Sequence, residues 1–88
     1  MTEAILKTPL AERDTAMLDF EERWFTLEVP KEQAIIERFG CSTTRYYQRL
    51  NTLIDDPAAL DYKPLLVKRL RRQRAQRQAA RSARRLRG

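Results

Sequence analysis

FGCSTTRYYQRLNTLID, at residues 39–55, is the stretch of sequence that decides the fold. Its glycine follows Phe39 directly, as in helices that end in a left-handed residue, and Ser42 is a natural N-cap for a second helix. After this cap, apolar residues recur at helical spacing, at Tyr46, Leu50, Leu53 and Ile54. The stretch therefore predicts two helices joined by a turn of about three residues, the layout of a helix-turn-helix.

The second helix of this motif is predicted to keep one side on the core and to present the other to a ligand. The core positions of the motif are Ile36, Phe39, Cys41, Tyr46 and Leu50. The side chains at or near the exposed N-terminal part are Ser42, Thr43, Thr44, Arg45, Tyr47 and Gln48. The register is open by one residue, so the two tyrosines can exchange roles. Arginine and glutamine can bind base edges and hydroxyls can bind phosphate, so the exposed set is a candidate DNA-recognition surface.

Another amphipathic helix is predicted upstream of the motif, over about residues 9–25, with Thr8 as its N-cap. Its buried stripe consists of Met17, Phe20 and Trp24, and Leu18 and Phe25 widen this stripe. A connector then leads to the first helix of the motif, which is expected over residues 31–39. Pro30 supports this boundary, because the residue before a proline is driven away from helical geometry.

Downstream of the motif, the sequence Asp55-Asp56-Pro57 is predicted to end the third helix, and residues 58–63 are predicted to form a linker. Pro64 is the expected start of a fourth helix. The first two turns of this helix carry an apolar side that can dock on the body, made by Leu65, Leu66, Val67 and Leu70.

The predicted fold class is all-α, a small three-helix helix-turn-helix bundle followed by a C-terminal Arg-rich helix or arm. The chain is expected to divide into a flexible N-terminus (1–8), a helix-turn-helix domain (9–61) and a basic helix or arm (62–88). Formation of a homodimer stays open. Helix-turn-helix proteins bind paired half-sites as dimers, but this sequence has no heptad seam of convincing length.

Charge is divided unevenly along the chain. Residues 1–61 contain seven basic and twelve acidic side chains, whereas residues 62–88 contain eleven basic and no acidic ones. A cationic segment on a slightly acidic body points to a polyanionic partner, and arginine suits forked contacts with phosphate. We therefore expect double-stranded DNA as the partner, with the arm on its backbone or minor groove. The candidate residues of the arm are Lys68, Arg69, Arg71, Arg72, Arg74, Arg77, Arg81, Arg84 and Arg85.

An enzymatic function is not expected. The chain has no histidine, Cys41 therefore lacks a histidine base, and the two glycines do not form a phosphate-binding loop. A helix-ending turn explains the nearby aspartates better than a metal site does, so no metal or cofactor is expected. No stretch approaches the roughly 20 apolar residues of a membrane span, and a single cysteine fits a reducing compartment. A cytoplasmic location at the nucleoid is therefore expected.

Three segments of the chain together resemble a known family. They are ERDTAMLDFEERWF, KEQAIIERFGCSTTRYYQRLNTLIDDPAAL and PLLVKRLRRQRAQRQAARSARR. Over about residues 10–85 the chain is similar to a family of small actinobacterial proteins catalogued as a domain of unknown function. The resemblance implies a helix-turn-helix-like body with a basic C-terminus. The third helix is also similar in layout to the DNA-reading helix of sigma-factor region four.

The function expected from these features is non-catalytic DNA binding, by a small transcriptional regulator or a nucleoid-associated protein. The third helix would enter the major groove. Two alternatives stay open: an RNA-binding protein, or an adaptor that binds an acidic surface of RNA polymerase or the ribosome. Removal of residues 71–88 is expected to weaken binding to all DNA sequences alike, whereas changes at Thr44 or Gln48 are expected to alter sequence preference.

Overall fold

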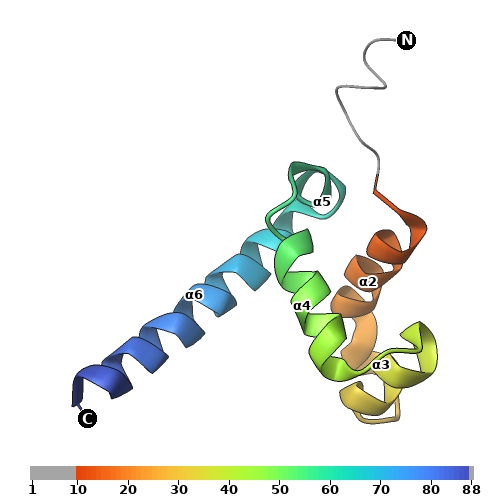
Figure 1. The fold of residues 1–88 in the computed structure, drawn as a ribbon. Helices are drawn as coiled ribbons and strands as arrows, with labels where there is room; N and C mark the ends of the chain where they lie inside the picture. The colour runs from red at the N-terminus through yellow and green to blue at the C-terminus, as the bar shows by residue number, and fades with distance from the viewer. Residues whose placement is uncertain (1–9, 88) are drawn as a thin grey trace.

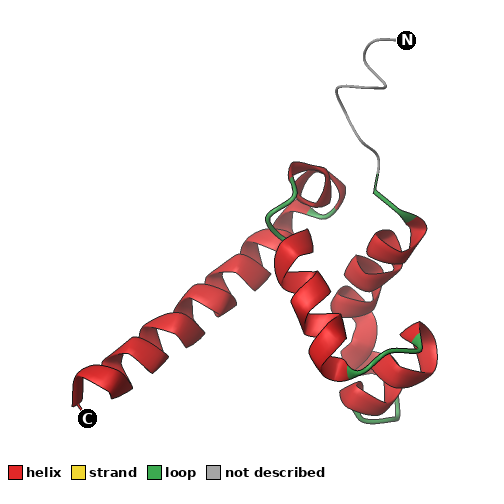
Figure 2. Ribbon diagram, in the orientation of Figure 1, coloured by secondary structure: helices red, strands yellow, loops and turns green. Residues whose placement is uncertain are grey.

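The computed structural model describes residues 10–87, with side chains as far as Arg84. This part of the chain is all-α and contains no strand, which confirms the predicted fold class (Figure 2). The elements, in chain order, are α2 (Glu12–Arg23), the short 3-10 helix η1 (Trp24–Thr26), α3 (Lys31–Phe39), α4 (Thr43–Leu53), α5 (Pro57–Tyr62) and α6 (Pro64–Arg87).

The core lies where α2, α3, α4 and the beginning of α6 meet (Figure 1). The buried hydrophobic residues are Met17, Leu18, Phe20, Ala34, Ile35, Tyr46, Leu50, Leu53, Ile54, Ala59, Leu66 and Val67. Aromatic rings join three of the helices, because the Phe20 ring lies edge-on to Phe39 and Tyr46 at centroid distances of 5.6 Å and 6.0 Å. These edge-to-face contacts orient the packed helices as well as burying apolar area.

The turn between α3 and α4 has the geometry that the sequence predicts. Gly40 ends α3 in the left-handed conformation, with a φ of 63°, which a glycine adopts without a steric penalty. Ser42 then caps α4, since its side-chain oxygen accepts a hydrogen bond from the backbone N–H of Arg45 at 3.2 Å. The two helices and their short turn are therefore confirmed, and their bounds match the expected ones.

The last helix, α6, begins inside the core and then leaves it. Leu66 and Val67 are buried and Leu70 packs against the core, which confirms that the first turns of this helix dock on the body. Leu65 was expected in the same contact but is 82% exposed, because it lies on the outer side of the first turn. Further along, α6 projects away from the body and gives the molecule its longest dimension of 55 Å (Figure 1).

Two predicted boundaries are wrong. Residues 58–63 are not a linker, because α5 occupies Pro57–Tyr62. The Asp56 side chain caps this helix by accepting a hydrogen bond from the N–H of Ala58 at 2.9 Å, with proline in the first turn. The upstream helix begins at Glu12 rather than at residue 9, since Ala11 has an extended backbone. The predicted Thr8 cap and flexible N-terminus (1–8) lie outside the described residues.

Three predicted apolar-stripe or core positions are also wrong. Phe25 is 68% exposed, because it lies in the 3-10 turn η1 that follows α2 and not in the helix itself. Trp24 is 37% exposed, because α2 ends at Arg23 and the tighter 3-10 turn that follows rotates the indole away from the stripe of Met17 and Phe20. Ile36 is 54% exposed, because α3 packs through the neighbouring Ala34 and Ile35 and each further residue turns about 100° around the helix.

Candidate nucleic-acid interface

The buried side of α4 settles the register of the two tyrosines. Tyr46 is 1% exposed, and its hydroxyl donates a 2.5 Å hydrogen bond to a carboxylate oxygen of Glu21, which is itself buried. Burial, together with the adjacent Glu21 charge, raises the pKa of Tyr46, so the phenol stays protonated and keeps donating. Tyr47 is exposed on the other side of the helix. The predicted alignment, with Tyr46 inside and Tyr47 outside, is confirmed.

Glu21 connects three elements through its two oxygens. One oxygen accepts a hydrogen bond from the Tyr46 hydroxyl, and the other accepts a hydrogen bond from Lys31 Nζ at 3.1 Å. The Lys31 ammonium also lies over the rings of Trp24 and Tyr47, 5.0 Å and 5.2 Å from their centroids. Because a buried carboxylate needs partners for its charge, this network favours one orientation of α3 and α4 relative to α2.

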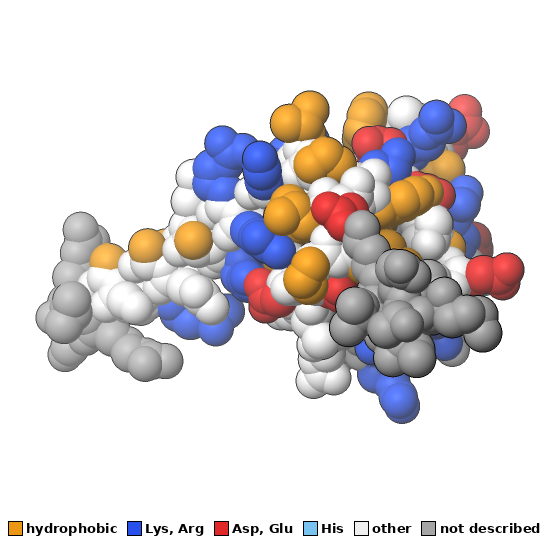
Figure 3. Space-filling model, turned by 90° about the horizontal axis from the view of Figure 1, so that it is seen from above, with side chains coloured by type: hydrophobic (Ala, Val, Ile, Leu, Met, Phe, Trp, Pro, Cys, Tyr) orange, Lys and Arg blue, Asp and Glu red, His pale blue; other side chains and the backbone are white. Residues whose placement is uncertain are grey.

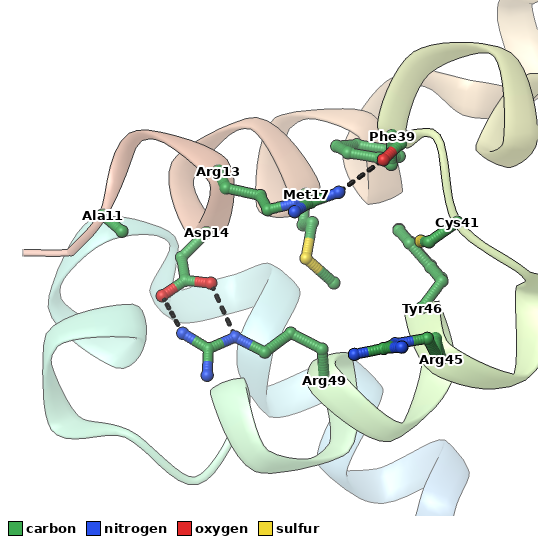
Figure 4. A pocket seen from close by; sticks show the side chains of 9 residues that line it. All are labelled: Ala11, Arg13, Asp14, Met17, Phe39, Cys41, Arg45, Tyr46 and Arg49. Carbon is green, nitrogen blue, oxygen red and sulfur yellow. Dashed lines mark hydrogen bonds and ion pairs between the residues drawn. The ribbon is translucent and has the colours of Figure 1, made fainter.

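A second buried carboxylate holds the other side of α4. Asp14 is 5% exposed, and Arg49 donates to its two oxygens from Nε at 2.9 Å and Nη2 at 2.6 Å (Figure 4). The same hydrogen bonds raise the pKa of the Arg49 guanidinium. Arg13 donates to the backbone oxygen of Phe39, close to the turn. Asp14, Glu21 and Arg49 were not predicted from the sequence, because charged residues on an amphipathic helix usually lie on its solvent side and nothing local marks these three as buried or paired.

The predicted recognition residues gather on the first turns of α4. Thr44, Arg45, Tyr47 and Gln48 are exposed and Thr43 is half-buried. Ser42 is exposed too, but its hydroxyl oxygen serves the N-cap. Arg45 borders a pocket of about 330 Å³ that also contains Met17, Cys41 and the Arg49–Asp14 pair (Figure 4). The structure thus brings together hydroxyl, amide, phenol and guanidinium groups on one short helical surface.

Two of the predicted arm residues bind the protein itself. Arg71 donates from Nε to the backbone oxygen of Ile54. Arg74 donates to the backbone oxygen of Asn51 at 3.1 Å and makes a forked contact with Asp55 at 3.1 Å and 2.7 Å. Carbonyls at the end of a helix lack intrahelical partners, and these guanidinium groups supply them. Arg71 and Arg74 therefore fasten α6 to the C-terminal end of α4.

The other described cations of the arm are exposed to solvent and do not bind the body. The exposed ones are Lys68, Arg69, Arg72, Arg77, Arg81 and Arg84. Within residues 10–84 none of these six makes a hydrogen bond or ion pair that would neutralise it. The Arg85 side chain lies outside the described part of the chain. The charge of Arg69 contributes to the lowered pKa of Glu22. Apart from this interaction, the long helix carries a high density of positive charge without acidic partners among the described residues.

The Asp55–Arg74 contact predicts a pH-dependent stability. The hydrogen bonds from Arg74 lower the pKa of the Asp55 carboxyl below its ordinary value. A lowered folded-state pKa stabilises the protein above the unfolded pKa of about 4, and this stability is lost as the pH falls through the folded pKa. We expect Asp55→Asn to melt below the wild type at neutral pH and to approach it under acid conditions, in thermal unfolding followed by circular dichroism. A difference in melting temperature that does not change on acidification would contradict this assignment.

The described residues define a small all-helical protein with a cationic final helix. They contain no cluster of histidine, cysteine, aspartate or glutamate that could hold a metal ion. None of the helices within residues 10–87 is long and apolar enough to cross a membrane. Residues 9–82 match the family described as Protein of unknown function (DUF3263), and the chain belongs to this family. No curated protein and no solved structure matches the chain.

Proposed function

We propose that this protein binds double-stranded DNA without catalysis, as a small transcriptional regulator or a nucleoid-associated protein. The observation that carries the proposal is the pairing of an exposed polar surface on α4 with the unpaired cations of α6. α4 contains no acidic residue and neither does α6, so both present favourable surfaces to phosphate. The resemblance of the three sequence segments supports an actinobacterial origin, and the proposed location is the cytoplasm, at the nucleoid.

The α4 surface suits a major groove. The groove is about 12 Å wide and admits an α-helix whose N-terminal residues contact base edges. Gln48 can bind adenine through two hydrogen bonds, Arg45 can bind guanine, and the Thr44 methyl group can contact thymine. Thr44 and Gln48 are four residues apart and therefore lie on the same side of α4. The short turn before α4 and the Ser42 cap support the helix-turn-helix assignment.

The α6 surface suits the phosphate backbone. Its 24 residues correspond to about 36 Å at about 1.5 Å per residue, close to one turn of duplex. Each arginine that neutralises a phosphate releases condensed counterions, which makes binding strong at low salt and largely independent of sequence. In this proposal α6 supplies most of the affinity and α4 supplies the sequence preference.

Gln48→Ala tests the role of α4. We expect this variant to lose about 10- to 100-fold in affinity for the duplex that the wild type prefers, and to lose little for other duplexes, because one bidentate base contact is removed. The measurement is selection from randomised duplexes, followed by fluorescence anisotropy. Gln33→Ala is the matched control, since Gln33 is an exposed glutamine on α3, and it should leave the preference unchanged.

The same titrations separate the proposal from its rivals. If the wild type bound no duplex at about 0.15 M salt, the DNA-binding proposal would be wrong. Tighter binding to a structured RNA of equal length would favour the RNA-binding alternative. Retention of a defined polymerase or ribosomal protein after nuclease treatment, without duplex binding, would favour the adaptor.

A further inference from the structure

α4 and α6 meet at one end and separate along their length (Figure 1). Their meeting point is the contact of Arg71 with Ile54 and of Arg74 with Asn51 and Asp55. From this point α4 runs back towards the α3–α4 turn while α6 leaves the body. A groove is open between them, lined near its closed end by side chains from both helices.

One side of α6 lines this groove near the point where the two helices meet, and the same side continues outward along the projecting part of the helix. Arg74 contacts α4 directly, and Arg77 lines a cavity of about 340 Å³ together with Tyr47 and Asn51 of α4. Arg81 and Arg84 follow Arg77 at spacings of four and seven residues. Residues at these spacings lie on the same helical face. The packing side of α6 therefore continues outward as a row of arginines, which we call the groove row: Arg77, Arg81 and Arg84.

The opposite side of α6 has a different composition. Ala75, Ala79 and Ala83 are exposed and repeat every four residues, so they form a row of small apolar side chains. Figure 3 shows hydrophobic side chains in a row along the projecting part of this helix. Over residues 75–84 the arginines are thus sorted onto one side of α6, which a merely solvated cationic helix does not require.

Positive charge is neutralised at the closed end of the groove and not beyond it. Arg74 is paired with Asp55. Glu21 also lines the groove, but its carboxylate is occupied by Lys31 and Tyr46. The α4 wall contributes only uncharged polar groups near the groove row, the Tyr47 phenol and the Asn51 amide. An anion at the mouth of the groove would therefore meet the unpaired Arg77 guanidinium on one wall and hydrogen-bonding groups on the other, and Arg81 and Arg84 continue the positive charge outward.

We propose that α4 and α6 are the two walls of a single groove that holds one phosphodiester strand of the duplex. The groove row contacts successive phosphates, while Tyr47 and Asn51 contact the same strand from α4. Residues 77–84 span about 10 Å at about 1.5 Å per residue, which matches about three phosphates at 3.4 Å of rise per strand. This inference rests on the proposed function and adds which face of α6 binds DNA.

Two triple variants of equal net charge test whether the groove row binds the phosphodiester strand. One removes the groove row, as Arg77→Gln, Arg81→Gln and Arg84→Gln. The other removes three exposed cations from other faces of the same helix, as Lys68→Gln, Arg69→Gln and Arg72→Gln. We expect the groove variant to lose about 100-fold in duplex affinity at about 0.15 M salt and to flatten the log–log salt slope by about 2.7. The matched variant should also lose affinity, but about tenfold less than the groove variant, because its cations face away from the groove and act on the duplex only through screened charge.

The outcomes are distinguishable. Equal losses in the two variants would overturn the groove and leave the proposed DNA binding standing. If neither variant lost affinity, both the groove and the proposed role of α6 would be wrong, whereas a wild type that bound no duplex would overturn the proposed function itself. Asn51→Asp adds a test of the α4 wall. A carboxylate placed in the groove should lower affinity about tenfold, whereas Gln33→Glu on α3 should change it less than about threefold. Circular dichroism melting confirms that each variant is folded, and no effect of Asn51→Asp would place the strand elsewhere.

Discussion

Removal of residues 76–88 is expected to lower the affinity for duplex DNA by at least about 100-fold, and by a similar factor on every sequence. The segment contains five arginines and no acidic residue. If each arginine neutralises one phosphate, the slope of log affinity against log salt concentration becomes less steep by about 4.5. Anisotropy titrations between about 0.05 and 0.2 M salt measure both quantities on two unrelated duplexes.

The structure shows why the truncation begins at residue 76 rather than at residue 71. Arg71 and Arg74 hold α6 against Ile54, Asn51 and Asp55, so their removal would mix a loss of DNA contacts with a loss of packing. Circular dichroism should show that the shorter chain unfolds at nearly the wild-type temperature. An affinity at low salt equal to that of the full chain would contradict the role of α6.

Leu66→Ala is expected to destabilise the protein by about 2–5 kcal/mol, while Leu65→Ala changes the free energy of unfolding by less than about 0.5 kcal/mol. The two leucines are adjacent, but Leu66 is 5% exposed and Leu65 is 82% exposed. Truncation of the buried side chain removes transfer free energy and leaves a cavity between α6 and the body. Urea unfolding measured by circular dichroism gives both values.

A loss of this size is a large part of the stability of so small a domain, so Leu66→Ala should be partly unfolded at room temperature. Leu65→Ala is its control for helix propensity, since both changes place alanine in the first turn of α6. Similar stabilities of the two variants would show that the beginning of α6 does not belong to the core.

Local patterns were sufficient for most of the fold. The left-handed glycine and the Ser42 cap define the α3–α4 turn in neighbouring residues, so no distant contact is needed to recognise it. Periodicity likewise placed Tyr46 and Leu50 in the core. It failed at Trp24 and Ile36, because helix ends and the choice of packing face depend on neighbouring helices.

Only part of the candidate site could be predicted from local sequence patterns. The composition of the chain indicates a cationic C-terminal segment, and helical periodicity predicted the residues at or near the exposed part of α4, which are Ser42, Thr43, Thr44, Arg45, Tyr47 and Gln48. Composition could not separate Arg71 and Arg74, which bind α4, from Arg77, which has no acidic partner among the described residues. All three are arginines on one helix, and only the position of α4 beside them distinguishes their roles.

Local chemistry alone therefore specified the all-helical class, the turn before α4 and the concentration of positive charge at the C-terminus, because caps, periodicity and net charge are properties of adjacent residues. Tertiary packing alone decided which leucine of α6 is buried, which carboxylates are enclosed and which arginines face α4. These properties depend on residues far apart in the chain, such as Asp14 with Arg49 and Glu21 with Tyr46, whose proximity arises only when the helices pack.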